Sequence, residues 1–166
     1  GYWGYPSPEI TSVEDVPGDQ GGTVLVTYTS SRLDSGPENA IAYYSFWRAL
    51  PPSKSDVIAN NNWLELITAG DIDQQVIRME TNGSQTIFWE LISSANPYSL
   101  PGYSIALSTL SDHTETNDGL HYFQVMAHGV VIGGQWTSEA GQGWSVDNLG
   151  PSLVVGLQGA EIEEPA

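Results

Sequence analysis

Three histidines are the first side chains of this sequence to consider for metal binding or acid–base catalysis. They are His113, His121 and His128. A zinc site needs ligands that converge from one side, whereas residues seven apart on a strand point to opposite faces of its sheet. His121 and His128 have that spacing within one predicted strand. The sequence therefore predicts structural or surface histidines and no metal site.

Two acidic clusters, at residues 71–73 and 112–118, offer the oxygen ligands that calcium prefers. Neither has the EF-hand spacing with glycine at its sixth position, so solvated loops are the favoured interpretation and calcium binding the weaker one. Two carboxylates could also hydrolyse a glycoside, but a chain with twenty acidic residues always supplies such pairs. No nucleophile elbow, phosphate loop or dinucleotide motif is present. We therefore predict a protein that is not an enzyme and needs no cofactor.

The charge balance of the 166 residues argues against polyanionic partners. Four basic residues stand against twenty acidic ones, giving a formal net charge of −16, whereas phosphate binding needs clustered Lys and Arg. We expect neither nucleic acid nor an anionic membrane as a partner. Because no run of about 18 apolar residues occurs, membrane insertion is not expected. Charged residues make up only 14%, which is typical of secreted β proteins and favours an extracellular or cell-surface location.

Alternating and β-branched runs separated by Gly, Pro and Asn turns predict an all-β chain. An antiparallel β-sandwich follows from many short strands with regular turns, and we place it at residues 9–158, with one long insertion at about residues 50–84. Residues 53–69 of the insertion have room for a turn or two of helix. The clearest strands are at residues 22–30, 40–48, 75–80, 85–92, 103–107 and 120–128, and weaker ones are at 130–132 and 144–146. The Asn82-Gly83 pair indicates a tight hairpin turn between 75–80 and 85–92.

Two glycine-rich segments bracket the predicted strands. They are residues 15–22 (Asp-Val-Pro-Gly-Asp-Gln-Gly-Gly) and 143–151 (Gly-Trp-Ser-Val-Asp-Asn-Leu-Gly-Pro). With the strand residues 43–48, 89–92 and 120–128 between them, the order resembles a fibronectin type III-like module of large secreted bacterial surface proteins, over roughly residues 10–151. The resemblance implies a seven-stranded, immunoglobulin-like sandwich and a spacer, adhesion or scaffolding role outside a bacterial cell.

The ends of the chain suggest how copies could assemble. Residues 1–8 form an aromatic N-terminal arm, and residues 159–166 form an acidic C-terminal tail. Exposed aromatic side chains are costly, so the arm either folds back on its own sandwich or docks on a neighbour. We expect docking by strand exchange, head to tail, which propagates as a surface filament or fibre made of copies of this chain. The expected interface residues are Tyr2, Trp3, Tyr5 and Ile10 as anchors, with Leu153, Val154 and Val155 as a final strand or part of the acceptor.

Carbohydrate binding, or adhesion as a spacer within a larger protein, is the alternative. Trp63, Trp136 and Trp144 lie near predicted loops. Coplanar exposed rings could stack on sugars, so these three residues are the candidate glycan site.

Overall fold

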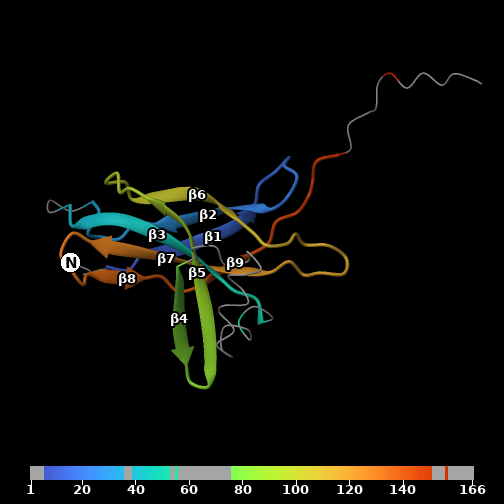
Figure 1. Cartoon of the computed structure of the whole chain (residues 1–166). Coiled ribbons are helices and arrows are strands. Elements are labelled where there is room, and N and C mark those ends of the chain that lie inside the picture. Colours follow the sequence, from blue (N-terminus) through green and yellow to red (C-terminus); the bar gives the residue numbers. More distant parts are fainter. Residues whose placement is uncertain (1–5, 36–38, 53–54, 56–75, 151–155, 157–166) are drawn as a thin grey trace, which may run out of the picture.

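The described part of the chain folds into nine strands (Figure 1), and the predicted all-β fold is confirmed. The computed structural model describes residues 6–35, 39–52, 55, 76–150 and 156. The strands are β1 (Glu9–Asp15), β2 (Thr23–Thr29), β3 (Ile41–Ala49), β4 (Ile77–Asn82), β5 (Gln85–Ala95), β6 (Gly102–Ser108), β7 (His121–Gly129), β8 (Gln135–Thr137) and β9 (Gly141–Gly143). Within these ranges there is no helix of the length and hydropathy that crossing a bilayer requires.

Two antiparallel sheets pack face to face as a β-sandwich. The three-stranded sheet has the order β1-β2-β6, and the six-stranded sheet has the order β4-β5-β3-β7-β8, with β9 also paired to β7. In Figure 1 the β4–β5 hairpin extends beyond the sandwich. β4 lies inside the predicted insertion, so the insertion adds a strand to the six-stranded sheet. Residues 53–54 and 56–75 of the insertion, which include most of the short helix considered there, lie outside the described residues.

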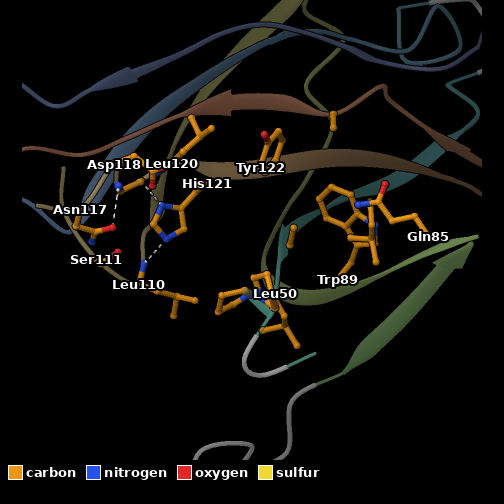
Figure 2. A pocket seen from close by; sticks show the side chains of 16 residues that line it. Leu50, Gln85, Trp89, Leu110, Ser111, Asn117, Asp118, Leu120, His121 and Tyr122 are labelled. Atoms are coloured by element: carbon orange, nitrogen blue, oxygen red, sulfur yellow. Dashed lines mark hydrogen bonds between the residues drawn. The ribbon is translucent and has the colours of Figure 1, made fainter. Parts of the chain in front are cut away.

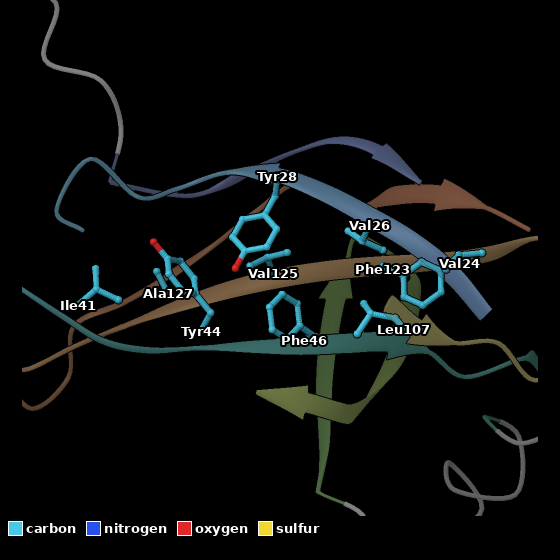
Figure 3. Close-up of a cluster of buried hydrophobic side chains, with 10 residues drawn as sticks. All are labelled: Val24, Val26, Tyr28, Ile41, Tyr44, Phe46, Leu107, Phe123, Val125 and Ala127. Carbon is cyan, nitrogen blue, oxygen red and sulfur yellow. The ribbon is translucent and has the colours of Figure 1, made fainter. Parts of the chain in front are cut away.

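The hydrophobic core lies between the sheets (Figure 3). Alternate residues of β2, β3 and β7 point into it, as the period of two along a strand requires. The buried members are Val24, Val26, Tyr28, Ile41, Tyr44, Phe46, Leu107, Phe123, Val125 and Ala127. A smaller cluster of Trp47, Trp89 and Met126 lies on the other face of the six-stranded sheet.

The six clear strand predictions are confirmed, and the two weaker ones are wrong. Residues 130–132 form a turn, because Gly133 has a φ of +91° and the Gly134 N–H donates to the Val131 carbonyl at 3.1 Å. Residues 144–146 do not pair, and β9 just before them does. The predicted hairpin turn is present, but its two loop residues are Gly83 and Ser84, of which only Gly83 has positive φ.

The two glycine-rich segments contact each other directly. The Asp15 carboxylate accepts hydrogen bonds from the Val146 N–H (2.8 Å) and the Asn148 side-chain amide (2.6 Å). The Asn148 side-chain carbonyl in turn accepts from the Gly18 and Asp19 N–H groups at 2.6 and 3.1 Å. We name these contacts the Asp15–Asn148 clamp. They satisfy the backbone of two loops far apart in the sequence, which gives the segments a structural role.

A buried arginine, paired with a glutamate of its own sheet, connects the two sheets. Arg48 on β3 and Glu90 on β5 are cross-strand neighbours, 5% and 1% exposed. The Arg48 Nε donates to Glu90 at 2.8 Å, and its Nη1 donates to the Ser108 carbonyl at 2.6 Å and hydroxyl at 3.1 Å. Because Ser108 ends β6 in the opposite sheet, one guanidinium fixes both sheets at this end of the sandwich.

Removing one charge of this pair should destabilise the fold severely. Arg48→Met leaves Glu90 buried without a counterion, and such losses typically cost about 3–5 kcal/mol. The double variant Arg48→Met/Glu90→Leu should recover much of this loss, since no uncompensated charge remains. Urea unfolding of the three proteins measures both values. A single variant as stable as the wild type would contradict the assignment.

Candidate functional site

β6 is the least protected sheet edge in the described part of the chain. It pairs with β2 over all seven residues without a bulge, from Gly102 opposite Thr29 to Ser108 opposite Thr23. It contains no proline and no charged residue. Proteins normally block a free edge with charges, prolines, bulges or short length, because unpaired peptide groups recruit another strand.

Alternation along β6 identifies the peptide groups that face outward. The Pro101 carbonyl and the Thr109 N–H bond toward the β2 side, with Ser30 and Gly22. Residues 101, 103, 105, 107 and 109 therefore point to β2, and residues 102, 104, 106 and 108 point away from it. The Arg48 contact to the Ser108 carbonyl agrees with this assignment. Among the described residues, the N–H and C=O groups of residues 102, 104 and 106 have no hydrogen-bond partner.

The other described edges carry protection. β1 has a bulge between Ile10 and Ser12 and bears three acidic side chains. β1 also packs closely against β9. A Cβ added at Gly143 of β9 would meet the Val13 carbonyl of β1 at 2.6 Å. β4 carries Arg78 and Glu80, and β8 and β9 have only three residues each. β6 is thus the strand best suited to accept a partner.

A pocket of about 680 Å³ opens at one end of the sandwich (Figure 2). Its walls come from the segment after β3, from β5, from the loop before β7 and from the start of β7. Apolar side chains dominate, and polar groups lie among them, a composition typical of binding pockets. The main wall residues are Leu50, Pro51, Ile87, Trp89, Leu110, Leu120 and Tyr122, with Gln85, Asn117, Asp118 and His121 as polar neighbours.

His121 holds the loop that forms one wall of this pocket. Its Nδ1 lies 2.6 Å from the Gly119 carbonyl, and its Nε2 accepts from the Leu110 N–H at 3.0 Å. An imidazole with these partners is neutral, with the proton on Nδ1. Burial lowers the pKa of His121 below its ordinary 6.5, although the hydrogen bond to Gly119 opposes that shift. With both nitrogens engaged, His121 has a positioning role in the wall.

The buried carboxylate of Asp34 also has a structural environment. Asp34 is 1% exposed and accepts from the Tyr103 hydroxyl (2.6 Å), the Tyr44 hydroxyl (3.0 Å) and the Ser99 N–H (3.1 Å). Burial raises the pKa of both tyrosines, and their hydrogen bonds to Asp34 raise it further. This network ties two loops to the core.

The acidic cluster at residues 112–118 is engaged in turn hydrogen bonds. Asp112 accepts from the Ser145 hydroxyl (2.5 Å) and the Gly22 N–H (2.7 Å), and these bonds lower its pKa. Asp118 accepts from the Leu120 N–H at 3.1 Å. No group of three or more potential metal ligands occurs among the described residues, and the cluster at 71–73 lies outside them.

The predicted assembly residues fall mostly outside the described ranges. Tyr2, Trp3, Tyr5, Leu153, Val154 and Val155 are all in that group. Ile10 lies in β1 opposite Tyr28 and packs against the core of its own chain. It therefore stabilises this copy's sandwich and is not a free anchor.

The predicted tryptophan platform does not form from its two described members. Trp136 lies on β8 and packs against the core, whereas Trp144 follows β9, is 47% exposed and lies 5.5 Å from the His113 ring. On β7, Ala127 is the partner of Trp136, and His121 is the partner of Gly143, which directly precedes Trp144. The distance along β7 from Ala127 to His121 is about 20 Å, so the two tryptophans lie far apart. Trp63 lies outside the described residues.

Sequence reasoning did not single out the β6 edge or the end pocket. The absence of any charge from residue 102 to residue 108 was a usable signal for the edge. The pocket had no such signal, since its walls come from segments that lie far apart in the sequence. No protein-family model matches this chain, and no curated protein sequence is significantly similar to it.

Acidification should destabilise the fold through His121. Its folded pKa lies below 6.5, so the unfolded chain takes up the proton first, and stability present above about pH 6.5 is lost as the pH falls toward the folded value. His121→Gln should flatten the pH dependence of the urea midpoint in this window. Burial also lowers the pKa of His128, so His128→Gln should flatten the slope by a separate share, and the double variant should flatten it further. An unchanged slope in His121→Gln would contradict the assignment.

Proposed function

We propose that this chain is a non-catalytic extracellular structural module, fibronectin type III-like in character, whose copies join by β-strand addition at β6. Repetition of this contact gives a filament or fibre at a bacterial cell surface. The observation that carries the proposal is the edge of β6, which is regular and uncharged and is not paired by any other strand in the described part of the chain.

Strand addition uses the backbone for affinity and alternate side chains for specificity. The outward peptide groups of residues 102, 104 and 106 supply the acceptor ladder. The donor is the N-terminal arm of another copy, because residues 1–5 contain no proline and carry Tyr2, Trp3 and Tyr5. Every second side chain of an added strand faces the same way, so Trp3 lies on the face opposite to Tyr2.

The direction of the chain through the sandwich favours head-to-tail assembly. β1 begins at Glu9 opposite Thr29, and at its other end Asp15 holds Asn148 through the clamp. Seven strand residues span about 20 Å. A donor leaving one end therefore reaches a neighbour displaced along the strands, and such a heterologous contact does not close.

Ala106→Pro should block association without unfolding the chain. Residue 106 is exposed and its N–H points away from β2, so proline removes an outward donor and no bond of the native ladder. Ala106→Ser keeps that N–H and is the control. Sedimentation velocity should show wild-type association in Ala106→Ser and its loss in Ala106→Pro. A folded Ala106→Pro protein that assembles normally would exclude β6 as the acceptor.

Deletion of residues 1–8 tests the donor separately. The truncated chain keeps β6 but lacks Tyr2, Trp3 and Tyr5, so it should accept an arm and offer none. When mixed with the full chain, the truncated chain should therefore stop the growth of fibres. A truncated protein that still polymerises alone would rule out the arm as donor.

Glycan binding remains a second candidate, at a new location on the outer face of the six-stranded sheet. There Arg78 lies over the Trp47 ring at 5.0 Å and donates to Gln124, which donates to Glu80 at 3.3 Å. The Arg78 Nε and the Trp89 indole N–H are buried and have no acceptor among the described residues, so polar groups are left unsatisfied at this face. Tryptophan fluorescence across a panel of neutral glycans tests this candidate, and a flat response would count against it.

A further inference from the structure

The turn between β7 and β8 exposes three consecutive apolar side chains. Val130, Val131 and Ile132, here named the hairpin tip, are 58%, 74% and 102% exposed. Hydrogen bonds at the base hold the turn, from the Gly129 N–H to the Gly134 carbonyl at 2.7 Å and from the Val130 N–H to the Ala40 carbonyl at 2.9 Å. A contiguous, well-held apolar projection of this kind marks an interaction site.

The end pocket and the hairpin tip lie at opposite ends of the same strand. Leu120 and Tyr122, at the start of β7, line the pocket, and the tip directly follows the end of β7 at Gly129. Nine strand residues separate them by about 30 Å. In Figure 1 the β7–β8 turn lies at the left end of the sandwich, while the loop before β7 lies at the right end. Copies stacked along β7 would therefore bring a tip to each pocket.

Charge and polarity make the two surfaces compatible. The net charge of −16 opposes most contacts between copies. Residues 129–137 contain no charged side chain. Among the described residues that line the pocket, Asp118 is the one carboxylate, and the apolar wall includes Leu50, Trp89 and Tyr122. An uncharged apolar projection can enter this pocket without bringing a like charge to Asp118.

We propose that the hairpin tip of one copy inserts into the end pocket of the next copy. This contact rests on the head-to-tail association proposed above and names a second surface for it. The partner is a second copy of this chain, and the ligand class is an apolar β-turn. Ile132, the most exposed of the three, is the residue that enters the pocket. The contact is heterologous, so it extends the fibre in the same direction as strand addition.

Intermolecular disulfide formation tests the contact directly, because the chain contains no cysteine. Ile132→Cys protein is mixed with Tyr122→Cys protein under mild oxidation, and a disulfide needs Cα atoms within about 7 Å. The control partner is Leu25→Cys, which is similarly exposed, at 38% against 42% for Tyr122, and lies on the three-stranded sheet. Preferential pairing with Tyr122→Cys supports the proposal. Equal pairing with both partners, or none with Tyr122→Cys, overturns it.

A charged tip separates this proposal from strand addition. Ile132→Asp should weaken association more than about tenfold, whereas the exposed loop variant Leu100→Asp should not. If Ile132→Asp assembles like the wild type while Ala106→Pro does not, the tip contact is wrong and strand addition stands. If Ile132→Asp loses assembly and Ala106→Pro keeps it, the tip contact stands and β6 is not the acceptor. A wild type that stays monomeric contradicts both.

Discussion

The contact between Arg48, Glu90 and Ser108 is the interaction on which the arrangement of the sandwich depends. Two buried charges must pair inside the protein, because neither can be left without a partner there. The pair fixes β3 against β5, and the second arm of the guanidinium fixes the end of β6 in the other sheet. Immediately after Arg48, Ala49 and Leu50 turn into the wall of the end pocket. One side chain therefore positions both the candidate acceptor strand and the candidate pocket.

The Asp15–Asn148 clamp joins the end of β1 to the segment that follows β9. Its residues belong to the two segments that dominate the sequence, yet their side chains satisfy backbone groups and each other. The features of the sequence that are easiest to see thus maintain the fold. The surfaces proposed for association are inconspicuous in comparison, since they consist of plain strand residues at β6 and valines and isoleucine in a turn.

The β-branched and aromatic runs, separated by turn residues, were sufficient to predict the strands that cross the core. β2 buries every second residue, whereas β3, β5 and β7 bury consecutive residues because both faces of their sheet are covered. The same signal failed at residues 130–132, where β-branched residues occupy a turn that is set by Gly133. β1 was missed because its three acidic side chains obscure an edge strand that buries little. Neither the unpaired edge nor the pocket could be predicted, since both depend on which segments become neighbours after folding.

Negative-stain electron microscopy of the purified full chain, without crosslinker, tests the central claim most directly. Strand addition at one end and an open edge in each copy predict regular, unbranched fibres of a single subunit type. Fibres that disappear in Ala106→Pro and persist in Ala106→Ser would agree with the account. Dispersed monomers at every accessible concentration would contradict it and would favour a glycan-binding or spacer module instead.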